Sequence, residues 1–236
     1  MMKLIKLELR RNNIRTYLVS SAVSCVVLLG LIYFIAYAAQ LEDSSAREIV
    51  FRSYTNIFRL TGIISLVVFS TMSAIMYSRL IICEYTGKRA ALLFSYPVSR
   101  SKILLAKLLL VFVFTSVSML ICTAIPYLVF SITESVSPIV VQDVMTVGLV
   151  ADALKTSSVA VLALGGIGIV SLRIGFIQKS VPTTLISAIL LSAIYGNAAI
   201  NANSILSSVL ISGIGLVVAV TVMAELSNKI NKMEVE

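Results

Sequence analysis

The sequence of 236 residues contains no histidine and no tryptophan, and only 13% of its residues carry a charge. A soluble domain usually has about 25% charged residues, and a disordered chain has many charges and few apolar residues. Here 58% of the residues are hydrophobic and the mean hydropathy is +1.01. The scarcity of charge and the apolar excess together exclude both a soluble globular protein and a disordered one.

Several kinds of chemical site are also excluded. Cysteine occurs only at Cys25, Cys83 and Cys122. These positions have no metal-ligand spacing, and none falls in a predicted external segment, so we predict neither a metal site nor a disulfide framework. The membrane spans predicted below lack the buried acids or histidines on which proton-coupled carriers and intramembrane proteases depend. We predict no catalytic residue in this chain.

A phosphate-binding loop is missing as well. The pattern GxxxxGK[ST] could only be placed at Gly87-Lys88. It fails there because Ile82 stands where the first glycine is needed and Arg89 stands where a serine or threonine is needed. We therefore predict that the chain is not an enzyme by itself and binds no cofactor. Any energy from ATP must come from a separate chain.

Long apolar runs predict six membrane-spanning helices, since about 20 apolar residues cross a bilayer. The 45 uncharged residues between Lys179 and Glu225 are too many for one crossing, and turn residues near Gly196 divide them into two. The predicted spans cover residues 17–39, 60–78, 103–132, 156–172, 181–199 and 204–224. The predicted fold class is an all-α membrane protein, with residues 1–236 forming a single transmembrane domain.

The net charge of +8 is distributed unevenly between the two sides of these spans. Fifteen of the 19 Lys and Arg residues fall in the N-terminal, second, fourth and C-terminal segments, and four fall in the others. Positive charges are enriched in cytoplasmic segments of membrane proteins. Both termini are therefore predicted to be cytoplasmic, and the positive charge does not indicate nucleic acid as a partner.

Residues 2–15 alternate apolar and basic side chains. Their cations are Lys3, Lys6, Arg10, Arg11 and Arg15. This pattern predicts an amphipathic elbow helix that lies on the bilayer surface, with its cations at anionic head groups. The alternative is a basic anchor that only sets the orientation of the first span.

The segment 79–102 carries the strongest functional signal. Glu84 and Lys88 are four residues apart in the order that favours a helix. An apolar stretch at residues 90–94 follows, and Pro97 then ends the helix. An exposed helix with an apolar tip needs a partner surface. The alternative is a basic loop that serves only to set topology.

This segment resembles the signature of type 2 ABC exporter permeases. The resemblance rests on Glu84-Tyr85-x-Gly87-Lys88-Arg89, Leu92-Leu93-x-Ser95-Tyr96-Pro97-Val98-Ser99-Arg100 and Lys102-Ile103-Leu104-x-Ala106-Lys107. In that family the stretch between the second and third spans forms a coupling helix that docks on the ATPase. The resemblance implies an ATPase-docking role for Glu84, Tyr85, Gly87, Lys88, Arg89, Leu92, Leu93, Phe94, Pro97 and Arg100.

The resemblance also implies partners and a cargo class. The chain would be the permease of an ATP-driven exporter in the bacterial plasma membrane, paired with a second permease that is the same or related. A separate cytoplasmic ATPase would bind ATP and magnesium. The short segment at residues 200–203 is similar to the compact bacterial form, whose systems export antimicrobial or amphipathic peptides or drugs. A non-transporting scaffold or sensor and a secondary carrier remain alternatives.

Two further features concern packing. Pro126 is expected to kink the third span. The glycines Gly165, Gly166 and Gly168 favour close helix contacts, because small residues let helix backbones approach each other in membranes. Ordinary packing is the alternative for both features.

Overall fold

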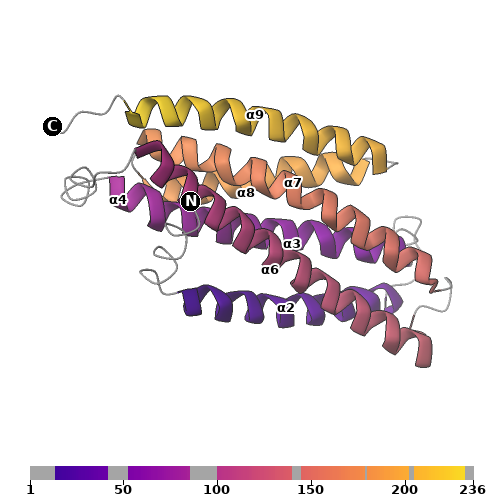
Figure 1. Cartoon of the computed structure of the whole chain (residues 1–236). Helices are drawn as coiled ribbons and strands as arrows, with labels where there is room; N and C mark the ends of the chain where they lie inside the picture. The colour runs from indigo at the N-terminus through magenta and orange to yellow at the C-terminus, as the bar shows by residue number, and fades with distance from the viewer. Residues whose placement is uncertain are drawn as a thin grey trace.

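A computed structural model describes residues 14–41, 53–85, 100–139, 145–178, 180–201 and 205–231. This part of the chain is helical, and six of its helices are long and apolar enough to cross a membrane (Figure 1). They are α2 (Ile14–Leu41), α3 (Tyr54–Tyr77), α6 (Arg100–Val136), α7 (Val147–Gln178), α8 (Val181–Asn201) and α9 (Ile205–Asn231). A π-helix, η2 (Ser78–Ile82), and α4 (Cys83–Tyr85) directly follow α3. The predicted six-span, all-α fold is confirmed.

The helices are longer than the predicted spans. The largest difference is at α7, which begins at Val147 and not at residue 156. The apolar run was interrupted by Asp152 and Lys155, but both residues lie within the first turns of the helix and form an exposed ion pair of 2.8 Å. Charged side chains at a helix end can reach water while the helix continues. Apolar runs therefore locate a span but underestimate the length of its helix.

The six long helices alternate in direction, so the ends of the helices lie at two opposite ends of the bundle. We call one the termini end, where α2 begins, α4 and α6 meet, and α9 finishes. It lies on the left of Figure 1. We call the other the far end, where α3 and α7 begin and α8 finishes.

The helix α7 is central and packs against α3, α6, α8 and α9. Its glycines face three different neighbours. A Cβ at Gly165 would lie 2.6 Å from the Phe112 ring of α6, and one at Gly166 would lie 3.0 Å from the backbone oxygen of Gly215 in α9. At Gly168 a Cβ would lie 2.9 Å from side chains of α3. The predicted close packing through these glycines is confirmed.

An aromatic cluster fills the core near the far end. Phe130 makes edge-to-face contacts with Tyr33 and Tyr54, and Phe58 makes one with Tyr127. These contacts join α2, α3 and α6. The helix α6 continues through Pro126 without interruption.

The outer faces of α2 and α9 are apolar and exposed. Val26 and Phe34 of α2 are 71% and 73% exposed, and Ile214 of α9 is 69% exposed. Such faces suit lipid or a second membrane subunit, because a soluble protein rarely exposes so large an apolar surface.

Candidate functional site

The termini end holds the base of the connection between α4 and α6. Residues 86–99 of this connection lie outside the described part, but both flanking segments are described. On one side, η2 changes the hydrogen-bonding register after α3. Single-turn π-helices of this kind occur frequently at functional sites. On the other side, α6 begins at Arg100.

A buried ion pair joins these two flanks. The ammonium of Lys107 in α6 donates to the carboxylate of Glu84 in α4 and, at 2.9 Å, to the carbonyl of Leu80 in η2. The Lys107 side chain is only 1% exposed and the Glu84 side chain 13%. A buried charge is tolerated only when it is paired and hydrogen-bonded. The pair therefore fixes the start of α6 to the segment that follows α3.

This contact corrects one part of the sequence interpretation. Charge counting grouped Lys107 with the cytoplasmic cations although the predicted span 103–132 includes it, and we predicted no buried charge in the spans. The structure places Lys107 inside α6 with its charge buried. The sequence also suggested Lys88 as a helical partner of Glu84. Lys88 lies outside the described residues, so that pairing stays a prediction, and the structure adds Lys107, which is distant in sequence, as a partner of Glu84.

The other predicted site residues divide into described and undescribed groups. Tyr85 is the last residue of α4, and Arg15 is an exposed residue at the start of α2. The coupling-segment residues outside the described part are Gly87, Lys88, Arg89, Leu92, Leu93, Phe94 and Pro97. The elbow residues outside it are Lys3, Lys6, Arg10 and Arg11. The docking and elbow roles of these residues stay predictions.

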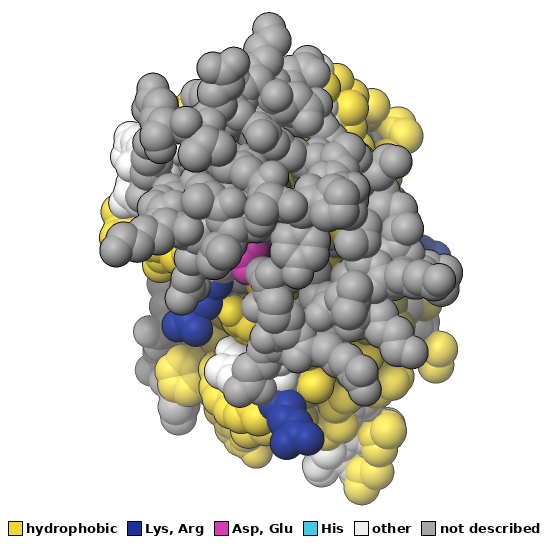
Figure 2. Space-filling model, turned by 60° about the vertical axis from the view of Figure 1, so that its left-hand side comes forward, with side chains coloured by type: hydrophobic (Ala, Val, Ile, Leu, Met, Phe, Trp, Pro, Cys, Tyr) yellow, Lys and Arg dark blue, Asp and Glu magenta, His cyan; other side chains and the backbone are white. Residues whose placement is uncertain are grey.

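Figure 2 turns the termini end toward the viewer. Lys and Arg side chains lie at its border, and an acidic side chain is recessed nearer its middle. The described residues contain no group of three or more potential ligands for a metal ion.

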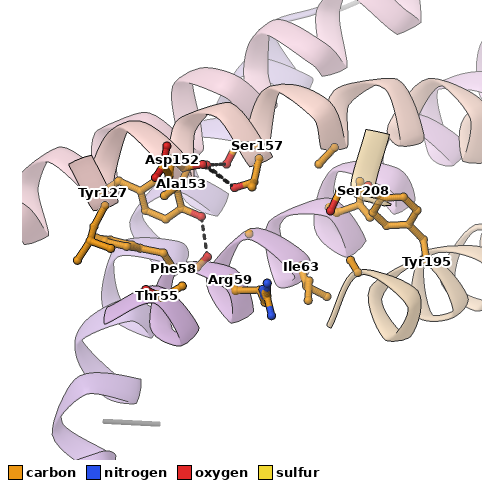
Figure 3. A pocket seen from close by; sticks show the side chains of 16 residues that line it. Thr55, Phe58, Arg59, Ile63, Tyr127, Asp152, Ala153, Ser157, Tyr195 and Ser208 are labelled. Atoms are coloured by element: carbon orange, nitrogen blue, oxygen red, sulfur yellow. Dashed lines mark hydrogen bonds between the residues drawn. The ribbon is translucent and has the colours of Figure 1, made fainter. Parts of the chain in front are cut away.

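The far end contains a cavity that the sequence did not predict. Its volume is about 380 Å³, and side chains of α3, α6, α7, α8 and α9 line it (Figure 3). Arg59 lies at its wall and donates to the carbonyl of Ile200 at 3.2 Å. Tyr127 crosses from α6 and donates to the carbonyl of Phe58 at 2.9 Å. These bonds fix two of its walls.

Comparisons with known proteins identify a family and a relative. Residues 4–209 match the family model described as "ABC-2 family transporter protein". A relative in Bacillus subtilis (strain 168), named "Uncharacterized protein YcbO", is 27% identical over 192 residues, which cover 80% of this chain and 81% of the relative. No solved structure matches. The match over most of the chain, together with six helices that can span a membrane, shows that this protein belongs to the ABC-2 family of transporter proteins.

Proposed function

We propose that the chain is the permease of an ATP-driven exporter whose ATPase is a separate cytoplasmic subunit. Membership of the ABC-2 family makes it a multi-pass membrane subunit of a transporter. The observation that carries the finer proposal is the buried pair between Lys107 and Glu84. This pair lies at the base of the segment in which the sequence predicts a coupling helix.

The pair gives this segment a mechanical role. A push on residues 86–99 acts on both flanks, because Lys107 holds α6 to Glu84 and to the carbonyl of Leu80. The helices α3 and α6 would then move together at the termini end. ATP binding to the partner shifts the equilibrium between two permease states only if it moves this segment differently in each state. Because the pair of Lys107 and Glu84 joins the two flanks, such a movement would reach α3 and α6 together.

The proposed orientation places the termini end in the cytoplasm of a bacterial cell, at the plasma membrane. The support is the distribution of Lys and Arg, with fifteen on the termini side and four on the other. A second permease, the same or related, would cover one of the apolar outer faces, such as those of α2 and α9.

The proposed cargo is an apolar or amphipathic molecule, such as an antimicrobial or amphipathic peptide or a drug. The helices offer mainly Ser, Thr and Tyr as polar groups, and their charged residues lie near the helix ends. A path of this kind suits a molecule with a large apolar surface better than it suits an ion.

Co-purification tests the proposal. The tagged chain would be extracted in mild detergent and assayed for a bound ATPase and for ATP hydrolysis. We expect Leu92→Asp in the predicted coupling helix to abolish both. The matched control is Val136→Asp, an equal change at a residue that is 82% exposed at the far end, and it should leave both intact.

Four outcomes would reject the exporter. If the wild-type chain retains no ATPase, or if Leu92→Asp behaves like the control, the coupling interpretation fails. If an ATPase binds but no cargo stimulates its turnover in reconstituted vesicles, the chain is instead a docking scaffold. Transport without any ATPase would indicate a secondary carrier.

A further inference from the structure

The cavity at the far end has a wall built from five helices. The residues that line it lie near the far-end termini of α3, α7, α8 and α9 and near the C-terminal third of α6. Its volume of about 380 Å³ lies within the range of roughly 300–1,000 Å³ that is typical of small-molecule sites. A cavity of this size inside one subunit can take a small molecule or a single alkyl chain, but not a folded peptide.

The wall changes from charged to apolar with depth. Arg59 and Asp152 lie five residues into α3 and α7, or about 8 Å from the helix starts. Leu66 and Ala160 line the cavity seven and eight residues further along the same helices, or about 10–12 Å deeper. The two charged residues therefore lie nearer the far-end starts of α3 and α7, and the apolar Leu66 and Ala160 lie deeper. A molecule with a polar head and an apolar tail fits this gradient.

The cavity wall also carries hydroxyl groups that make no hydrogen bond to the described residues. They are the hydroxyls of Thr55, Tyr195 and Ser208. Thr55 is exposed and the other two residues are half-buried, so these hydroxyls are available to water or to a polar ligand. Figure 3 shows Tyr195 and Ser208 on the same side of the cavity.

The wall of the cavity carries one cation, Arg59, and one carboxylate, Asp152. The carboxylate of Asp152 already accepts from Lys155 of its own helix at 2.8 Å, and both side chains are mainly exposed. Arg59 is half-buried in the wall. A guanidinium has five N–H donors, so it can hold the carbonyl of Ile200 and a carboxylate or phosphate together.

We propose that this cavity is a binding site for a single-chain amphipathic anion. The anionic head lies at Arg59, the hydroxyls of Tyr195 and Ser208 donate to it, and the alkyl tail extends between α3 and α7 toward Leu66. The site does not depend on the exporter proposal, because it concerns binding alone and its test needs neither an ATPase nor transport.

The absence of tryptophan makes a direct test possible. Leu149→Trp places a single fluorescent reporter at the cavity wall, and Val218→Trp places a matched one on the exposed face of α9. Each variant would be placed in nanodiscs of neutral phosphatidylcholine. Terminally brominated dodecanoate, dodecyl phosphate, dodecanol and dodecylamine would then be added as quenchers. We expect saturable quenching of the cavity reporter by the two anions, and only partition-type quenching of the outer reporter.

Two variants on the cavity reporter decide the assignment. Arg59→Gln should raise the half-saturating concentration of dodecanoate about tenfold or more, as expected for a lost charge-assisted bond. Ala160→Phe should remove saturable quenching by filling the deep end while Arg59 stays in place. Arg15→Gln, which removes a cation at the other end, should have no effect.

Three outcomes would overturn the proposal. The first is that the alcohol or the amine quenches as tightly as the anions. The second is that the outer reporter saturates at the same concentrations as the cavity reporter. The third is that Ala160→Phe leaves saturable quenching unchanged. If Arg59→Gln does not give a monodisperse protein, Ala160→Phe alone decides the outcome.

Discussion

Removal of the Lys107 ammonium should be among the most destabilising single changes in the described chain. The change Lys107→Met keeps the apolar stem but leaves the carboxylate of Glu84, which is 13% exposed, without this cation. It also leaves the carbonyl of Leu80 without the 2.9 Å bond. Breaking a buried ion pair by removing one partner costs about 3–5 kcal/mol. We expect a decrease of that size in the free energy of unfolding.

Replacing both partners should restore most of this loss. A buried pair exchanged for apolar residues of similar volume is often neutral, because the cost of desolvating both charges disappears with them. The double variant Lys107→Met with Glu84→Leu should therefore be more stable than Lys107→Met alone. The control Lys155→Met breaks an exposed pair at the far end and should cost about 0.5 kcal/mol or less.

Equilibrium unfolding in mixed micelles, with helix content followed by circular dichroism, measures these differences. The reasoning fails if Lys107→Met is no less stable than Lys155→Met. It also fails if the double variant loses as much stability as its two single changes added together. A folded double variant has a further use: if it still binds the ATPase but no longer couples hydrolysis to cargo, the pair transmits motion as well as stabilising the fold.

Three other predictions concern separate parts of the molecule. Gly166→Ala, whose Cβ would lie 3.0 Å from a backbone oxygen of α9, should lower the free energy of unfolding by about 1–3 kcal/mol, whereas Gly213→Ala, which meets nothing within 4 Å, should not destabilise; thermal unfolding compares them. Tyr54→Phe removes the 2.5 Å bond to buried Glu134 and should cost about 1–3 kcal/mol by the same measurement; an unchanged stability would contradict the bond. Ser137→Cys in a cysteine-free background should react with an impermeant maleimide in intact cells, and labelling only after lysis would reverse the proposed orientation.

The number and order of the helices could be predicted because the sequence encodes them locally. A span must be apolar over about 20 residues, and the charge-free runs met that condition without reference to any other part of the chain. The run between Lys179 and Glu225 was correctly divided, since turn residues near Asn201 coincide with the end of α8. The helix ends were less predictable, because charged residues such as Lys155 lie within the helix but outside the apolar run.

The buried pair was not predictable for a different reason. Lys107 is 23 residues from Glu84, and the contact depends on the packing of α6 against the segment after α3. Lys107 lies inside the predicted span 103–132, but charge counting grouped it with the cytoplasmic cations that precede it. The 26 uncharged residues that follow it, up to Thr133, indicate the start of a span but do not indicate that its charge is buried against Glu84.

The far-end cavity could not be predicted from sequence patterns at all. Its wall combines residues from Thr55 to Ser208, each of which is unremarkable in its own helix. Arg59 was counted as one of four cations outside the predicted spans, although α3 begins before it at Tyr54. Only the packing of five helices shows that this cation borders a cavity.

The two candidate sites are joined by one continuous helical segment. From Tyr54 to Tyr85 the chain is helical without a gap, so Arg59 at the cavity and Glu84 at the buried pair are about 38 Å apart on a single rod. A tilt of this segment about its middle moves both of its ends. If the ATPase tilts it in this way, the cavity wall changes shape, and by reciprocity an anion that binds one cavity shape better alters the affinity for the ATPase or its nucleotide state. Brominated dodecanoate should then shift ATPase affinity in the wild type but not in Ala160→Phe, and equal shifts in both would separate the two sites.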